Sequence, residues 1–477
     1  MAMKTVRSVL RGAMWGLFLA LLAAALLLGS GYTSRRRWAL LLALAALPVV
    51  WKGLPRLARR LSDLGSARAW LVLTLLCLVV KTAWVLWAQV PPEGDYATYW
   101  SYAKALAEEE ILSGGRYIAL FPHLFGYASF LSWFIALLGP LPLLAQGLNV
   151  ALTAVSGGFL FLLGRRFWGT EGGVTAYLLW IACPSQTVYN SLILSEPLYT
   201  ALLLLFLWLV TGPLPRRWTR CALLGLGAGL VLRWLSGVRP IGAVPLIALF
   251  LWRFCLTPDG LWEKGQRRRC AALLGVLLAA YLAAGPLWDS HVAARIGEEP
   301  SSTPGYSILV GFNPESGGQW NQADSELLYA YSDAPGATAQ DAQQAALGAA
   351  KERIAGGMDF VALFREKIRV FLGSDSACVG YSSSAVRHTK ELSLACDGFY
   401  YLLLLLAAAG GGELWRSGEE GGALLLPLYV LGLTAAQMLV EVAGRYHYSL
   451  LPVLMLLVPA ALAPGRQKNL KNRRESS

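Results

Sequence analysis

The sequence predicts an all-α membrane protein, a polytopic bundle of about twelve transmembrane helices with interfacial helices in its first outer loop and a small extracytoplasmic cap. The chain of 477 residues is 56% hydrophobic and 15% charged, and it contains 18 tryptophans. Its mean hydropathy is +0.50, which excludes a soluble globular protein. Only helices and closed barrels satisfy their own backbone in lipid, and the sequence lacks the alternating pattern of barrel strands.

Apolar segments of roughly 20 residues recur along the chain, and this is the length that crosses a bilayer as a helix. The first of them follows Lys4, Arg7 and Arg11, and we interpret it as a retained anchor instead of a cleaved signal. The predicted spans are 12–30, 38–52, 69–90, 141–164, 173–190, 197–212, 220–236, 240–256, 271–288, 399–410, 422–440 and 449–463.

The apolar segment 118–138 decides the topology, because counting it as a span inverts every later helix. Pro122 and Gly126 interrupt it, so we interpret it as an interfacial or re-entrant helix. With this choice 24 basic residues lie on the inner side and eight in the short outer loops, in accord with the positive-inside rule. The basic run at 35–37 is an exception, because it falls on the outer side.

On this topology five outer segments form one extracytoplasmic surface: 91–140, 190–197, 233–240, 289–397 and 441–448. The longest is rich in Gly, Ser, Gln and Ala, and its parts 324–356 and 359–372 are predicted to be helical, so it forms the cap. The chain is therefore divided into an N-terminal transmembrane hairpin, a transmembrane core that contains the first-loop segment 91–140, the cap, and C-terminal helices with a basic cytoplasmic tail. These parts are 1–66, 67–288, 289–398 and 399–477.

The net charge of +12 does not indicate nucleic-acid binding, because the basic residues cluster in short loops between helices. Five of the seven cysteines lie in or beside predicted spans, so no metal-binding cluster is visible. Cys378 and Cys396 lie together in the outer segment, where we expect a disulfide in an oxidising compartment, with two free thiols as the alternative.

Asp95 is the first candidate for chemistry. The apolar segment before it ends at Pro91-Pro92, and Tyr99 and Tyr102 follow at helical spacing, so Asp95 is expected at the start of a short interfacial helix. Taken alone, an acidic residue there is more simply a helix cap.

Other polar residues of the outer surface favour a chemical role for Asp95 over a helix cap. Glu196 in Ser-Glu-Pro suits a helix start, and Arg239 and Arg445 suit helix ends at an interface. His123 lacks metal-ligand spacing and suits an interfacial position. Together, however, a carboxylate and two arginines fit transfer from a phosphate-linked donor, because Arg binds phosphate through paired hydrogen bonds and a carboxylate can accept a proton.

Several motifs then resemble the GT-C superfamily of integral membrane glycosyltransferases. The closest branch contains the bacterial relatives of dolichyl-phosphate-mannose protein mannosyltransferase and lipid A aminoarabinose transferase. The resemblance spans roughly residues 70–463. Its motifs are Asp95 after the first core span, Pro-His-Leu-Phe-Gly-Tyr at 122–127, Leu-Asn at 148–149, Gly-Arg-Arg-Phe-Trp-Gly at 164–169, Leu-Ser-Glu-Pro-Leu-Tyr at 194–199, Val-Arg-Pro at 238–240, Gly-Phe-Asn at 311–313, Gly-Gln-Trp-Asn at 318–321 and Gly-Arg-Tyr-His-Tyr at 444–448.

The resemblance implies an enzyme that takes a monosaccharide from a polyprenyl-phosphate carrier and inverts its anomeric centre. Asp95 matches the first-loop aspartate of the family, a catalytic base or acceptor-orienting group, and Arg445 matches a position associated with the carrier phosphate. The second acidic residue of many relatives has two matches here, Glu93 and the run 108–110, which leaves a divalent cation open. The predicted substrate-binding residues are Arg445, Arg239, Tyr446, Glu196, Glu108 and His123.

We therefore expect a multi-pass cell-membrane glycosyltransferase whose active site faces outward. Its expected partners are a polyprenyl-phosphate-linked sugar and membrane lipid, and its acceptor can be a protein, a lipid or a glycan. The alternative is a transporter or flippase of a lipid-linked sugar, which should carry ionisable residues at mid-membrane. Lys81 is the main such residue here. A third reading is a non-enzymatic scaffold with the same fold.

Overall fold

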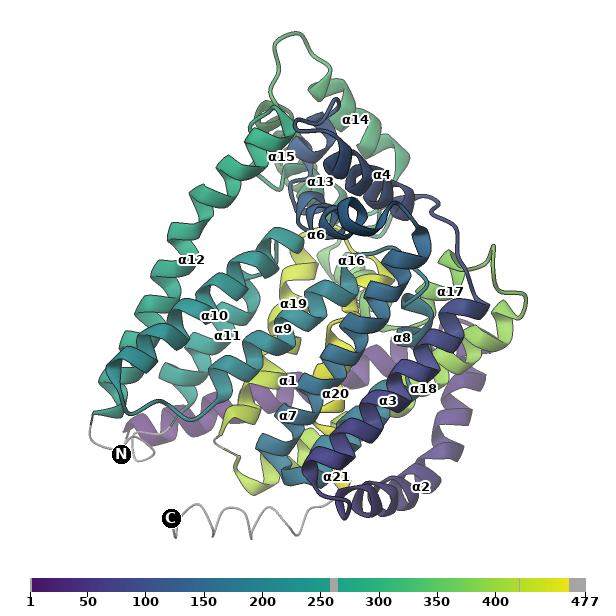
Figure 1. Cartoon of the computed structure of the whole chain (residues 1–477), viewed down its shortest axis with the longest axis vertical. Helices are drawn as coiled ribbons and strands as arrows, with labels where there is room; N and C mark the ends of the chain where they lie inside the picture. Colours follow the sequence, from purple (N-terminus) through teal and green to yellow (C-terminus); the bar gives the residue numbers. More distant parts are fainter. Residues whose placement is uncertain (1, 258–264, 420, 463–477) are drawn as a thin grey trace.

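The computed structural model describes residues 2–257, 265–419 and 421–462, and every regular element in these ranges is a helix. Nine of the described helices are long and apolar enough to cross a membrane, so the chain is an all-helical multi-pass membrane protein, as predicted (Figure 1). The predicted number of twelve spans is not confirmed. Shorter apolar helices cover the two remaining predicted spans, at Glu196–Thr211 and Ala243–Leu256, and a third, His123–Leu138, covers part of the predicted interfacial segment.

The membrane helices account for most of the predicted spans. The N-terminal part contains α1 (Ala2–Ser30), α2 (Ser34–Ser62) and α3 (Ser66–Trp87). The central part contains α7 (Pro142–Ala182), α8 (Pro184–Tyr189), α9 (Glu196–Thr211), α10 (Trp218–Val238), α11 (Ala243–Phe250) with η1 (Leu251–Leu256), and α12 (Gln266–Ile296). The C-terminal part contains α18 (Thr389–Ser417), η3 (Gly422–Leu424), α19 (Leu425–Leu439), η4 (Gly444–His447), α20 (Leu450–Met455) and α21 (Val458–Leu462).

Helix α7 doubles back on itself at Gly169. This residue has φ 79° and ψ −178°, a backbone conformation that glycine adopts readily. The two arms then pack closely, because the indole of Trp180 donates to the carbonyl of Thr153 at 3.0 Å and a side chain at Gly157 would collide with the ring of Tyr177. The turn falls in the predicted loop between the spans 141–164 and 173–190.

The segment 118–138 is broken, as its sequence suggested. It forms α5 (Arg116–Leu120) and α6 (His123–Leu138), which follows α4 (Asp95–Glu108) in the first outer loop. Helix α6 packs under α4 and against α10. A Cβ on Gly126 would lie 2.2 Å from the carbonyl oxygen of Gly237, so α6 and α10 touch through their backbones there.

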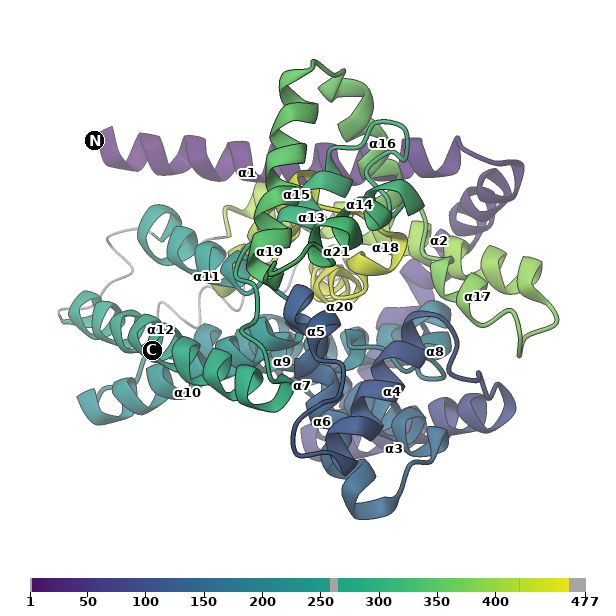
Figure 2. The same ribbon diagram turned by 90° about the horizontal axis from the view of Figure 1, so that it is seen from above.

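The predicted cap is present as a set of short helices. They are α13 (Gly305–Gly311), α14 (Gln322–Ser332), α15 (Ala339–Ala355), α16 (Phe360–Leu372) and α17 (Ala377–Tyr381). The expected helix over 324–356 is two helices, because Thr338 caps a new one through its bond to the amide of Asp341. The expected helix 359–372 is confirmed as α16, with Asp359 as its N-cap. Seen from above, α13–α16 overlie the C-terminal helices, and α4–α6 lie beside them over α3 and α7 (Figure 2).

Lys367 joins the cap to the C-terminal helices. Its side chain is fully buried, and its ammonium donates to the carbonyls of Gly311, Met438 and Val440 at 2.9, 2.8 and 2.7 Å. All three protons of the ammonium are therefore used, which offsets the cost of burying the charge. The same contact ties α16 to the ends of α13 and α19.

The basic run at 35–37 has a structural explanation. Arg35 and Arg36 lie 3.4 and 4.0 Å from Asp397, whose side chain is fully buried in α18. Arg36 also donates to Ser374 at 2.7 Å. Two of the three basic residues that violate the positive-inside rule thus neutralise a buried carboxylate. An unpaired Asp in this buried position would be strongly destabilising.

The disulfide prediction is wrong for this structure. Cys378 and Cys396 are both buried free thiols. The Cys378 thiol is directed to the carbonyl of Asp375 at 3.8 Å, so it packs as a small apolar side chain with a weak donor.

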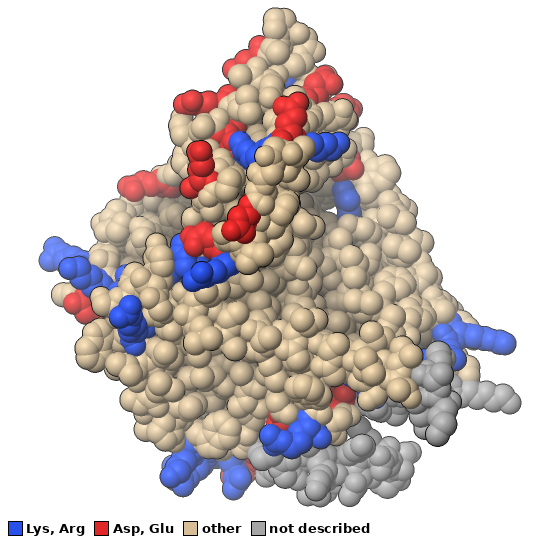
Figure 3. All heavy atoms as spheres, turned by 180° about the vertical axis from the view of Figure 1, so that it is seen from behind, with Lys and Arg blue, Asp and Glu red and all other residues tan. Residues whose placement is uncertain are grey.

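Charged side chains gather toward the two ends of the long axis. Acidic side chains lie over the cap together with several Lys and Arg, Lys and Arg predominate toward the opposite end, and a broad, mostly uncharged band lies between them (Figure 3). This band is the surface expected to face lipid.

We predict that Arg216 and the turn 169–172 face the cytoplasm, whereas Gly114 and Gly336 face outward. Ser477, also predicted to be cytoplasmic, lies outside the described residues. Single-cysteine labelling in a cysteine-free background measures this. Labelling of position 216 from outside would contradict both the interfacial assignment of α5 and α6 and the common outer surface.

Candidate active site

Asp95 is the first residue of α4, but it does not cap the helix. The N-cap is Gly94, with φ 53°, and no side chain bonds to the free amides there. The Asp95 carboxylate instead accepts a hydrogen bond from Nη2 of Arg445, which lies 350 positions later in η4. The helix-cap alternative is therefore not what the structure has.

Four charged side chains of alternating sign form a continuous chain. Arg445 pairs with Asp95, and its Nε lies 3.8 Å from Oε1 of Glu196. Glu196 begins α9, and the same oxygen accepts a hydrogen bond from Arg239, the residue after α10. We call these four residues the charge chain. It joins four elements that are distant in sequence.

Exposure changes steeply along the charge chain. The Asp95 side chain is 58% exposed, whereas Arg445 is 13% and Glu196 only 3% exposed. Asp95 is thus the end that reaches solvent, and Glu196 is the buried carboxylate between two guanidinium groups. Such an arrangement requires every inner charge to be paired.

Aromatic rings surround the two arginines. The guanidinium of Arg239 lies 5.0 Å from the ring centre of Tyr446, and that of Arg445 lies 5.6 Å from the same ring and 5.5 Å from Tyr381. These distances allow cation–π attraction. The Tyr446 hydroxyl donates to Glu441 at 3.0 Å. Burial raises the pKa of the Glu441 carboxyl, against the opposing hydrogen bond from Tyr446.

Several polar atoms of this cluster lack a hydrogen-bond partner among the described residues. They are Nε and Nη1 of Arg445, Nε of Arg239, Oε2 of Glu196 and the hydroxyl of Tyr96. Buried polar groups are nearly always satisfied, so unused arginine donors indicate room for an anionic ligand.

His447, which follows the two site residues Arg445 and Tyr446, has a different role. Its ring is buried, with Nε2 at 3.1 Å from Asp375 and Nδ1 at 2.6 Å from the carbonyl of Phe371. The carbonyl of Phe371 can only accept, so Nδ1 is the donor in that contact. Asp375 also accepts a hydrogen bond from Ser185. These contacts fix η4 in place and so position Arg445.

Of the other predicted site residues, Glu108 lies apart from the charge chain, whereas His123 is close enough to Arg239 and Arg445 that burial, together with their positive charges, lowers the pKa of its imidazole to about 4. Glu108 ends α4, about 20 Å along the helix from Asp95. Arg295 lies at that end and donates to the carbonyls of Leu106 and Glu109. His123 begins α6 and contacts the edge of Phe121, with ring centres 6.5 Å apart.

The sequence prediction missed Tyr381 and the pairing of Glu441 with Tyr446. Tyr381 comes from α17 in the cap, and no motif marks it. Glu441, two residues before the last outer motif, was recognisable only as one acidic residue among several. Among the described residues no group of three or more His, Cys, Asp or Glu side chains is placed to hold a metal ion.

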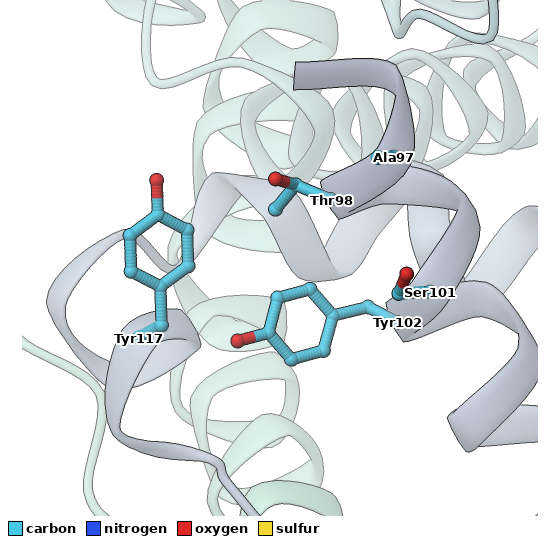
Figure 4. A pocket seen from close by; sticks show the side chains of 5 residues that line it. All are labelled: Ala97, Thr98, Ser101, Tyr102 and Tyr117. Atoms are coloured by element: carbon cyan, nitrogen blue, oxygen red, sulfur yellow. The ribbon is translucent and has the colours of Figure 1, made fainter. Parts of the chain in front are cut away.

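A cavity of about 600 Å³ opens along α4 beside Asp95. Its wall consists of Ala97, Thr98, Ser101, Tyr102 and Tyr117, and the last two present their rings to it (Figure 4).

No family model matches the chain, and no curated protein matches it. Among solved structures it is similar to two crystal structures of ArnT from Cupriavidus metallidurans, one bound to undecaprenyl phosphate and one in the apo state. The sequence identities are 15% and 14%, and the TM-scores are 0.34 and 0.35. The alignments cover 85% and 86% of this chain and 80% of each ArnT chain.

We predict that Glu196→Gln destabilises the protein more than Asp95→Asn does. Removing the buried charge leaves Arg239 without its carboxylate and Arg445 paired only with the exposed Asp95, which costs on the order of 3 kcal/mol. Exposed pairs contribute about 0 to 1 kcal/mol. Thermal unfolding of both purified variants beside wild type measures the difference, and equal midpoints would contradict the burial argument.

Proposed function

We propose that this chain is a membrane glycosyltransferase that transfers a monosaccharide from a polyprenyl-phosphate carrier to an extracytoplasmic acceptor, with inversion at the anomeric carbon. The observation that carries the proposal is the pairing of an exposed carboxylate, Asp95, with an arginine whose remaining N–H groups are unused, Arg445. One group can accept a proton from an incoming hydroxyl, and the other can bind a phosphate.

The proposed reaction is a single displacement. The acceptor hydroxyl passes its proton to the Asp95 carboxylate while its oxygen forms a bond to the anomeric carbon. The bond from that carbon to the phosphate oxygen breaks, and the electron pair remains on the phosphate. Arg445 then binds the departing phosphate through Nη1, the donor group that neither Asp95 nor Glu196 occupies. Attack opposite the leaving group inverts the centre.

Glu196 and Arg239 have supporting roles in this proposal. Glu196 lies between the two guanidinium groups, so it fixes the position of Arg445 and balances its charge. Arg239 holds Glu196 and adds an unused Nε to the same cluster. Pre-arranged charges of this kind lower a barrier, because they need no reorganisation during the reaction.

The transporter alternative receives less support. Charged residues within the predicted spans are scarce, and the main one, Lys81, donates to the carbonyl of Ile181 at 2.9 Å and to the hydroxyl of Thr187 at 2.6 Å. Its ammonium also lies 3.5 Å from the carbonyl of Trp180. These contacts fasten α3 to α7 and α8, which is a structural role.

Release of polyprenyl phosphate by the purified protein tests the proposal directly. A glycosyltransferase releases the lipid phosphate as the sugar is transferred, whereas a flippase or scaffold leaves the lipid-linked sugar intact. Comparing the cell envelope with and without the gene by mass identifies the acceptor.

Asp95→Asn should abolish sugar transfer and leave insertion and donor binding nearly intact. Asn keeps the size of Asp and can still accept the bond from Arg445, so only the proton-accepting charge is lost. Loss of a positioned base lowers the rate by about a hundred- to ten-thousand-fold. The triple change of Glu108, Glu109 and Glu110 to Gln is the matched control, with a smaller expected loss. Retention of more than about a tenth of the wild-type rate in Asp95→Asn would remove the base assignment.

Arg445→Lys should weaken transfer strongly although the charge is kept. A single ammonium cannot contact Asp95, Glu196 and a phosphate in the geometry of a guanidinium. Donor binding and turnover are measured in Arg445→Lys, Arg239→Lys and Arg445→Ala. The effect of Arg239→Lys should be smaller, because Arg239 acts through Glu196. Wild-type donor binding in Arg445→Ala would exclude Arg445 from the phosphate site.

A further inference from the structure

The cavity beside Asp95 is lined by uncharged side chains. Its wall is formed by three residues with aliphatic hydroxyl or methyl groups and by two tyrosines: Ala97, Thr98, Ser101, Tyr102 and Tyr117. The charge chain lies next to it, yet none of its members contributes to the wall. A ligand held here is therefore selected by shape and hydrogen bonding.

The hydroxyl groups of the wall are free to bind a ligand. Thr98, Ser101, Tyr102 and Tyr117 each carry one, and the described residues provide none of these hydroxyls with a hydrogen-bond partner. Each hydroxyl can both donate and accept. The cavity thus offers several bidirectional groups around a volume of about 600 Å³, which has room for a small ring molecule and more.

The rings of the two tyrosines are parallel and stacked with an offset. Their ring planes are 7° from parallel with centroids 6.2 Å apart, and both rings are seen face-on in Figure 4. Tyr117 also contacts Phe121, whose ring centre lies 5.1 Å away. Rings fixed in this way offer an apolar face, with their hydroxyls at the edge.

The cavity and Asp95 share one face of α4. Thr98 and Tyr102 follow Asp95 by three and seven positions, which places all three on the same side of a helix. Tyr102 is about 10 Å along the axis from Asp95. A molecule bound on the tyrosines can therefore extend one group to the carboxylate.

We propose that this cavity binds a neutral pyranose ring, stacked on Tyr102 and Tyr117 and hydrogen-bonded by Thr98 and Ser101. A pyranose combines an apolar face of C–H groups with a rim of hydroxyls, which matches the flat rings and the free hydroxyls of the wall. The role of that sugar in transfer rests on the proposed function, but its binding does not.

Other ligand classes fit less well. A phosphate or an anionic headgroup would need a cation in the wall. An acyl chain would leave the four hydroxyls unpaired. An extended peptide carries amide groups along its whole length, whereas the polar groups here lie around the two stacked tyrosine rings.

Saturation-transfer NMR with methyl α-D-glucopyranoside and methyl α-D-mannopyranoside tests the binding. The full chain is placed in lipid nanodiscs free of glycoside detergent and glycolipid. We expect transfer to the ring protons of at least one pyranoside, reduced about fivefold in Tyr102→Ala and Tyr117→Ala. Tyr102→Phe keeps the ring and should retain most of the signal.

Two further variants complete the binding experiment. Ser101→Trp fills the cavity from an exposed position and should also remove the signal, even if an alanine variant fails to fold. Trp320→Ala, an aromatic that is 59% exposed elsewhere on the cap, is the matched control and should leave the signal unchanged. Absence of transfer in wild type, equal transfer in the cavity variants, or transfer to a Gly-Ser-Gly peptide in place of the pyranosides would overturn the proposal.

The pyranose can belong to the donor or to the acceptor, and turnover separates the two. Polyprenyl phosphate release is measured first without acceptor, where water takes the place of the acceptor hydroxyl and the sugar is hydrolysed, and then with an envelope extract as acceptor. A defect of Tyr117→Ala that is already present without acceptor assigns the donor sugar to the cavity. A defect confined to acceptor-dependent transfer assigns the acceptor. Lack of release in wild type would reject the glycosyltransferase function and leave the pyranoside-binding result standing by itself.

Discussion

The charge chain is the interaction on which the outer face of this molecule depends. Asp95, Arg445, Glu196 and Arg239 come from four separate elements, and each inner charge is compensated only by its neighbours. In a poorly hydrated environment an unpaired charge is far more costly than the net stabilisation that a pair provides. A shift of any one of these elements would separate a pair. The geometry around Asp95 is therefore fixed by electrostatics as much as by packing.

Much of the fold is predictable from the sequence, because the signal for a membrane helix is strong and local. The apolar segments, the break in 118–138 and the turn around Gly169 follow from hydropathy, proline and glycine. The charge chain was predictable only as a set of residues on one surface. Topology brings Glu196, Arg239 and Arg445 to the same side, but their order of pairing requires three-dimensional coordinates.

The parts that the sequence could not provide are long-range pairings. Arg445 and Asp95 are 350 positions apart, and Arg35 and Asp397 are 362 apart. No local pattern identifies such partners. The sequence alone therefore presents Arg35 as a violation of the positive-inside rule, and only the fold shows its buried partner, Asp397. The position of Tyr381 beside Arg445 is likewise not predictable from the sequence, because a lone tyrosine in a polar segment belongs to no motif. The sequence predicts a disulfide between Cys378 and Cys396 because it carries no information about what surrounds each thiol in the fold.

Lys367 has a consequence for how substrates arrive. Two of its three carbonyl partners, Met438 and Val440, lie at the end of α19, and the third, Gly311, ends α13. Lifting the cap would strip the ammonium of two of its three acceptors and leave a charge underpaired at an apolar interface. The contact therefore holds the cap against the C-terminal helices. We expect molecules to reach Asp95 sideways, through the cavity that opens along α4, without a cycle of lid opening and closure.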